Sequence, residues 1–203
     1  MPHSAFEEIL TRIHSLQTEL EREFESLYIK KQKQFNYELK KGKVIFDESI
    51  RKLHKQYRMD LWPYLRDARM GHVLTAPIVY SVIIPLVLLD LFVTLYQHIC
   101  FRVYGIALVK RSKYLVIDRQ HLDYLNIIEK LNCVYCGYGN GLIEYVREVF
   151  ARTEQYWCPI KHASHLASQH RHAQNFVDFG DAERYRQELG RLRRQLQNKE
   201  EAT

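Results

Sequence analysis

Hydrophobic residues are concentrated in one block of the chain. In Val73–Ile99 the only formally charged residue is Asp90. A helix that crosses a bilayer needs about 20 apolar residues, so this block is long enough to span with tilt. Pro77 and Pro85 predict kinks inside it, because proline removes a backbone donor. Two arrangements fit: a single span followed by an interfacial segment that reaches Val109, or a re-entrant hairpin with both ends on one side.

The charges that flank the block do not decide between the two. Positive residues normally mark the cytoplasmic side of a span. Here the N-terminal flank carries Lys55, Arg58, Arg66 and Arg69, and the C-terminal flank carries Arg102, Lys110, Arg111, Lys113 and Arg119. Balanced flanks favour the hairpin, whereas the length of the block alone favours a span.

Asp90 is expensive in such a block, at about 2.5 to 3.5 kcal/mol on insertion scales. We expect it to be buried against a second copy of the chain or another subunit, in preference to lining a proton or ion path. Within the same helix, the nearest partner is the Thr94 hydroxyl, four residues on.

Heptad-like spacing marks the N-terminal region. One apolar stripe follows steps of three and four through Phe6, Ile9, Ile13, Leu16 and Leu20 and, after an interruption at Glu23, includes Leu27. A second runs through Phe46, Ile50, Leu53, Tyr57, Leu61 and Leu65. Such stripes predict two helices that pack as an antiparallel hairpin or self-associate. Between them, Gly42 marks either a tight β-hairpin turn or a break between helices.

The C-terminal third holds a candidate metal site. Cys133 and Cys136 form a C-x-x-C, and Cys158 is followed by a proline and, four residues on, by His162. A C-x-x-C holds two sulfurs near one point, as tetrahedral Zn or Fe requires. These four residues therefore predict a Cys3His centre for Zn or Fe, with His165 as a substitute ligand.

That interpretation places the cysteines at the two ends of a helix, Leu142–Gln155. Gly137–Gly141 would form the turn of the metal knuckle, and a fold-back would be needed to bring Cys136 and Cys158 together.

Two resemblances rest on these residues. The segment Cys133-Val-Tyr-Cys136-Gly137-Tyr138 resembles the first knuckle of rubredoxins and zinc ribbons, and Cys158-Pro159 resembles the start of their second; this implies a Zn or Fe site. The second knuckle would place a cysteine at 161, where Lys161 stands. The chain also resembles an uncharacterised family of bacterial membrane-anchored proteins with C-x-x-C-G-Y and Y-W-C-P-I-K-H segments, a resemblance that implies no activity.

Other chemistry remains open at the cysteines. A thiol–disulfide site on Cys133–Cys136 is the main alternative, and structural or inert thiols are the third. Haem attachment is excluded, because Gly137 stands where C-x-x-C-H has its histidine. No nucleophile and base are legible together, so an enzyme is not expected.

Composition and charge complete the picture. The chain is 46% hydrophobic and 12% aromatic, too apolar for disorder, and its net charge is +6. Basic residues in the tail, 181–196, fit anionic headgroups better than nucleic acid, for which the chain has no recognised motif.

The sequence therefore predicts an all-α protein in three parts: a helical arm, 1–71; a membrane segment and its extension, 72–109; and a helical Cys/His domain, 110–203. We expect a structural, assembly or accessory subunit at a bacterial cytoplasmic membrane, or alternatively a redox component. Reduced thiols place the Cys/His domain on the cytoplasmic side. The expected partners are the lipid bilayer and either a protein or a second copy, bound through the arm and the Asp90 face.

Overall fold

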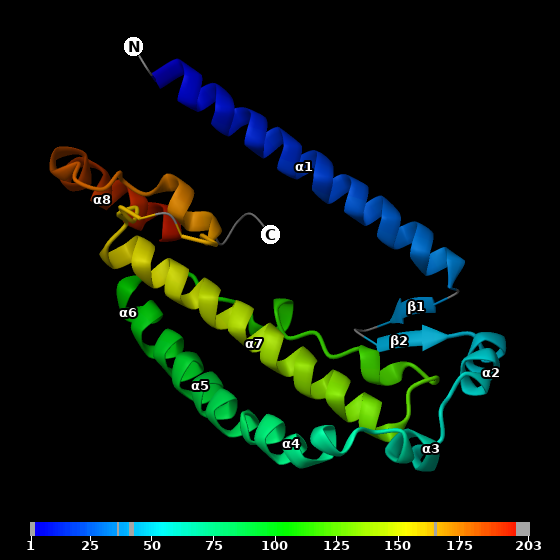
Figure 1. Ribbon diagram of the computed structural model, residues 1–203. Coiled ribbons are helices and arrows are strands. Elements are labelled where there is room, and N and C mark those ends of the chain that lie inside the picture. Colours follow the sequence, from blue (N-terminus) through cyan, green and yellow to red (C-terminus); the bar gives the residue numbers. More distant parts are fainter. Residues whose placement is uncertain (1–2, 36, 41–42, 165, 198–203) are drawn as a thin grey trace. The chain divides into compact units, whose positions relative to one another are not determined.

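The computed structural model describes residues 3–35, 37–40, 43–164 and 166–197 (Figure 1). The chain is 72% helix and 4% strand, so the expected helical class is confirmed. It divides into two compact units, 1–61 with 121–126 and 62–120 with 127–203. The apolar block thus shares a unit with the C-terminal helices and does not stand apart from them.

The first unit contains two helices and one β-hairpin. Helix α1 is His3–Gln34, strands β1 and β2 are Tyr37–Lys40 and Lys43–Phe46, and helix α2 is Glu48–Gln56. The strands are antiparallel, with Tyr37 opposite Phe46 and Lys40 opposite Lys43. A β-hairpin therefore forms around the Gly42 position, which itself lies outside the described residues.

A chain of aromatic contacts ties this hairpin to α2 and to 121–126. Tyr37 packs on Phe46, Phe46 on His54 of α2, and His54 on Tyr124, with ring centroids 4.9 to 5.7 Å apart. Beside them, Arg51 donates to Asp123 over 2.7 Å. These contacts explain why a short segment from beyond residue 120 belongs to the N-terminal unit.

The expected pairing of two striped helices is not found in the described part of the arm. The second stripe is divided among β2, α2 and helix α3, Leu61–Arg66, so it forms no single helical face. The stripe on α1 stays exposed at Ile13, Leu16, Leu20 and Leu27. The described part of this stripe is therefore an exposed apolar face of α1.

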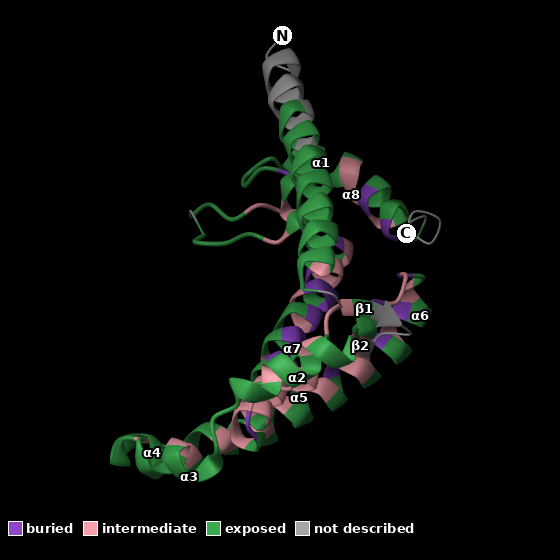
Figure 2. Cartoon of the chain, turned by 90° about the vertical axis from the view of Figure 1, so that its right-hand side faces the viewer, coloured by how far each residue is buried: buried purple, intermediate pink, exposed green. Residues whose placement is uncertain are grey.

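The second unit begins with a long apolar helix. It comprises α4, Met70–Ser81, and α5, Ile83–Tyr96, followed by a π-helical turn, Gln97–Phe101, and α6, Arg102–Tyr104. Pro85 has no N–H to donate to the carbonyl of Ser81, which explains the break at Val82. The 35 residues Met70–Tyr104 are long and apolar enough to cross a membrane, and only 6% of their most apolar window is buried (Figure 2).

Helix α7, Ile127–Trp157, is continuous over 31 residues and lies beside α5 (Figure 1). The two run in the same direction, because Tyr80 bonds to Asn132 near their starts and Tyr96 bonds to Thr153 near their ends. Their shared core includes Val93, Phe101, Leu142, Tyr145 and Val149.

The chain returns between these parallel helices through the connecting segment, 105–120. Gly105 begins it with a positive φ of 69°, which favours glycine. The segment lies directly on the glycine face of α7: a Cβ on Gly141 would be 2.6 Å from the Tyr114 carbonyl oxygen. Gly137–Gly141 is thus not the predicted turn but part of a helix whose missing side chains admit a neighbouring backbone.

The C-terminal region packs around the last turns of α7. Ile160 and Val177 form a parallel bridge, and a 3-10 turn, Arg171–Asn175, lies between them. Helix α8, Ala182–Gln197, buries Leu192 and Leu196. Gln155 donates to the Leu192 carbonyl over 2.9 Å and so joins α8 to α7.

Candidate functional site

A polar stripe lies on the covered face of the apolar helix. The Asp90 carboxylate accepts two hydrogen bonds from Arg111, at 3.1 and 2.6 Å, one from Tyr138 at 3.0 Å and one from Thr94 at 3.2 Å. Asp90 thus finds an ion-pair partner inside its own chain, on the connecting segment. Since four donors occupy the carboxylate, the arrangement fixes the helix and offers no open relay site.

About two turns beyond Asp90, Gln97 continues the stripe. Its side chain is 1% exposed and both of its amide atoms are used. The Gln97 amide nitrogen donates to the Tyr145 hydroxyl over 2.6 Å, and the Gln97 oxygen accepts from the Val109 N–H over 3.0 Å. Buried amides need such partners, so Gln97 sets the register of three segments at once.

The densest group of charges lies at the other end of α7. Glu148 is 7% exposed and accepts from Arg152 at 2.9 Å, from Arg171 at 2.9 Å and from His172 at 3.2 Å. Burial alone would raise the pKa of Glu148, but the hydrogen bonds from His172, Arg152 and Arg171 lower that pKa to about 2. The carboxylate therefore remains charged throughout the physiological range.

His172 connects this group to Gln155, the α7 residue that donates to the Leu192 carbonyl of α8. Its Nδ1 lies 2.6 Å from the Gln155 oxygen, while its Nε2 faces Glu148. Both ring nitrogens thus have a hydrogen-bond partner on α7. Arg152 also donates to the Ala107 carbonyl over 2.6 Å. The group holds the 3-10 turn, α7 and the connecting segment together.

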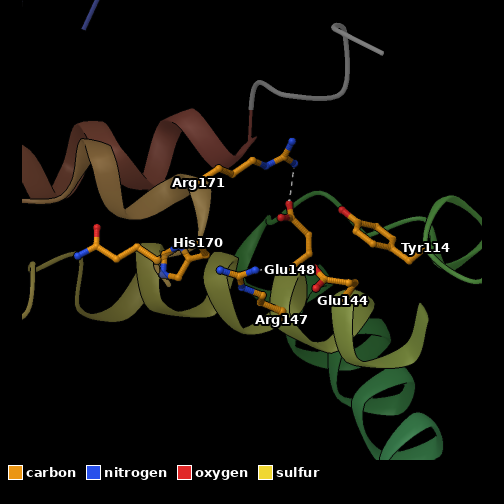
Figure 3. A pocket seen from close by; sticks show the side chains of 7 residues that line it. Tyr114, Glu144, Arg147, Glu148, His170 and Arg171 are labelled. Atoms are coloured by element: carbon orange, nitrogen blue, oxygen red, sulfur yellow. Dashed lines mark hydrogen bonds and ion pairs between the residues drawn. The ribbon is translucent and has the colours of Figure 1, made fainter. Parts of the chain in front are cut away.

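Beside Glu148 is a pocket of about 250 Å³ (Figure 3). It is lined by Tyr114, Glu144, Arg147, Glu148, Gln169, His170 and Arg171. Several of these groups are already paired: Arg171 with Glu148, Arg147 with Ser168, and His170 with Glu154. None of the seven is a serine, threonine or cysteine nucleophile, so the pocket offers charge and hydrogen bonding.

The predicted metal ligands are distributed along α7 and beyond it. Cys133 and Cys136 lie three residues apart inside the helix, whereas Cys158 follows its last residue. At a rise of 1.5 Å per residue, Cys136 and Cys158 are about 30 Å apart along the axis. One tetrahedral ion with bonds near 2.3 Å cannot bridge that span, so the fold-back required for a Cys3His centre does not occur in this chain.

Of the two predicted histidine ligands, the structure describes only His162. The exposed His162 has Nε2 4.0 Å from a Glu154 oxygen, and His165 lies outside the described residues. Within the described ranges, no three His, Cys, Asp or Glu side chains gather closely enough to hold a metal ion. The binding of Zn or Fe by this chain stays a prediction.

The redox alternative gains no support from the position of Cys133–Cys136. Disulfide oxidoreductases activate a thiol at a helix N-terminus, where the dipole acts within the first turn. Cys133 instead lies six residues beyond the start of α7. At Cys158, burial and then Glu154 raise the pKa of the thiol, which disfavours the reactive thiolate.

Sequence reasoning missed the residues that the structure gathers. Glu148 and Arg152 have i, i+4 spacing on a helix, a detectable but common signal. His172 was not among the predicted site residues, yet it is only 3% exposed. Arg111 was counted as a flanking charge, although it is the partner of Asp90.

Comparison with protein-family models, curated proteins and solved structures found no match for this chain.

Proposed function

We propose that this protein is a membrane-anchored accessory or assembly protein: an apolar helix attaches it to a bilayer, and its two helical units present surfaces to other components. The observation that carries the proposal is the exposure of the apolar helix. Its polar residues are satisfied internally, while Leu88, Leu91 and Phe92 are 50 to 64% exposed. A soluble chain would bury such a run, since large exposed apolar surfaces mark interaction with a membrane or a protein.

The exposed stripe on α1 supports the second part of this proposal. Ile13, Leu16 and Leu20 keep heptad spacing on a helix of 32 residues. That pattern is typical of a two-stranded coiled coil, so we propose a second copy of the chain as its first partner. The Asp90 face is occupied by α7 and Arg111 and is not used for association in this proposal.

The four described cysteines are free, which supports placing α7 in a reducing compartment, the cytoplasmic side of a bacterial membrane. Impermeant thiol reagents added outside intact cells should then fail to label Cys136 and Cys158, the two exposed thiols. Efficient labelling from outside would overturn this placement.

Flotation with lipid vesicles tests the membrane attachment. The full chain should float with vesicles, whereas Leu91→Glu/Phe92→Glu should remain below, because two carboxylates replace exposed apolar side chains. The matched control is Leu16→Glu/Leu20→Glu, an equal change on exposed positions of α1, which should still float. A wild-type chain that stays monomeric in buffer and does not float would refute the proposal.

A further inference from the structure

Exposed charges accompany the apolar helix along its middle as well as at its ends. Lys110, Arg111, Lys113 and Arg119 are all exposed and all belong to the connecting segment. The connecting segment returns along α5 and α7, so its charged residues lie beside the central part of the apolar helix.

The contacts of the connecting segment show beside which part of the apolar helix each charged residue lies. Arg111 pairs with Asp90, while Val109, two residues earlier, bonds to Gln97. Further along, a Cβ on Gly137 would lie 3.6 Å from the guanidinium of Arg119. Gly137 precedes Tyr138, which donates to Asp90. The cations thus lie beside the middle of the 35-residue helix.

Helix α7 carries further charges nearer the C-terminal end of the apolar helix, at the level of Gln97. Tyr145 bonds to Gln97 and is flanked by Glu144 and Arg147, which line the solvent-accessible pocket. If the apolar helix stood along the bilayer normal with its middle at the bilayer centre, Lys113 and Arg119 would be carried into the hydrocarbon, and the groups beside Gln97 would lie about 15 Å from the centre, at its edge. Exposed ionised side chains at that depth are strongly disfavoured.

We propose, on the basis of the membrane attachment proposed above, that the apolar helix Met70–Tyr104 lies in the plane of the membrane. Its uncovered face enters the hydrocarbon of one leaflet, and the connecting segment and α7 stay on the headgroup side. The uncovered face is formed by positions in helical repeat, among them Ile84, Leu88, Leu91, Phe92 and Leu95. Asp90, Thr94 and Gln97 occupy the opposite, covered face.

Length and charge favour a lipid surface as the occupant of this face. A helix of 35 residues is about 52 Å long, well beyond the roughly 30 Å of a hydrocarbon core. Trp62–Gln120 contains seven basic and three acidic residues, and one of the acidic ones, Asp90, is paired internally. The positive excess complements anionic headgroups.

Depth measurement along the helix tests the orientation. A full-length chain with its four cysteines replaced by alanine receives one cysteine at Val73, Leu88 or Ile99, three positions that are 50 to 56% exposed. Each carries a fluorophore, and nitroxide lipids with quenchers at known depths report its position in phosphatidylcholine–phosphatidylglycerol vesicles. Circular dichroism verifies that each variant keeps its helix content.

In-plane attachment gives the same depth at all three positions and headgroup depth for a fourth label at Lys113. A label at Leu88 that lies deep while those at Val73 and Ile99 lie shallow would overturn the proposal, whichever sides the ends occupy. Failure of the whole chain to float would instead refute the membrane function itself. Lys110→Gln/Lys113→Gln should weaken binding to anionic vesicles about 5-fold per charge and leave the depths unchanged.

Discussion

Replacing Gly141 by alanine tests the contact between the connecting segment and α7. An added Cβ would lie 2.6 Å from the Tyr114 carbonyl oxygen and 3.0 Å from the Leu115 Cα, both of which are backbone atoms that cannot rotate away. Alanine gains about 1 kcal/mol of helix propensity over glycine, whereas overpacking costs about 1 to 3 kcal/mol. The short distance places the cost near the upper end, so the free energy of unfolding should fall by about 1 to 2 kcal/mol.

Gly139→Ala is the matched control on the same helix. Its Cβ would lie 3.5 Å from a Leu86 methyl group, an ordinary contact, so the propensity gain should remain and stability should rise by up to about 1 kcal/mol. Thermal unfolding followed by circular dichroism, in one detergent and at one scan rate, should separate the two variants by several degrees, at about 2 to 4 °C per kcal/mol. Equal shifts for both glycines would refute the close approach.

Three further perturbations test the charged groups and the cysteines. Stability should fall as the pH drops from 4.5 toward 2, because the pKa of Glu148 is lowered to about 2 in the fold and its carboxylate stabilises only when charged. This pKa difference corresponds to about 3 kcal/mol, so Glu148→Gln should lower the free energy of unfolding by that amount at pH 7. The variant should also lose less stability than the wild type between pH 4.5 and pH 2. An equal loss in both proteins would contradict the lowered pKa of Glu148. Asp90→Asn should cost about 1 to 2 kcal/mol, since Arg111 is half-exposed, and adding Arg111→Gln should cost little more; additive losses in the double-mutant cycle would argue against the ion pair. Elemental analysis after Zn loading should show the same metal content in Cys158→Ser and His162→Ala as in the wild type. If Cys158→Ser instead lost as much metal as Cys133→Ser, α7 would not keep Cys158 about 30 Å from the C-x-x-C pair.

The apolar helix and the helical class were predictable because both depend on local signals. The length of Val73–Ile99 and the heptad steps of the arm are visible without any tertiary information. The extent of α7 was not, because Gly137–Gly141 has the composition of a turn. The three glycines were predicted to form the turn of a metal knuckle, yet they lie inside α7, where close packing of the connecting segment on Gly141 compensates for the low helix propensity of glycine.

The candidate site shows where sequence spacing fails. The C-x-x-C spacing occurs in metal knuckles, where it brings two sulfurs together, and also within one turn of a helix. Only the backbone conformation distinguishes the two cases, and the spacing does not reveal it. The pairing of Asp90 with Arg111 spans 21 residues, and that of Glu148 with His172 spans 24. Such pairs depend on the path that the chain takes between the two residues, and the periodicity of the sequence does not encode that path.

The parallel arrangement of α5 and α7 has a consequence during synthesis. Gln97 leaves the ribosome 48 residues before Tyr145, its buried partner. At about 5 to 20 residues per second, the apolar helix is complete for roughly 2 to 10 seconds before α7 can cover its polar stripe. During that interval its uncovered face and its unpaired Gln97 are both open to solvent. On the membrane attachment proposed above, the nascent chain would reach lipid, or be held by a chaperone, before its C-terminal helices exist.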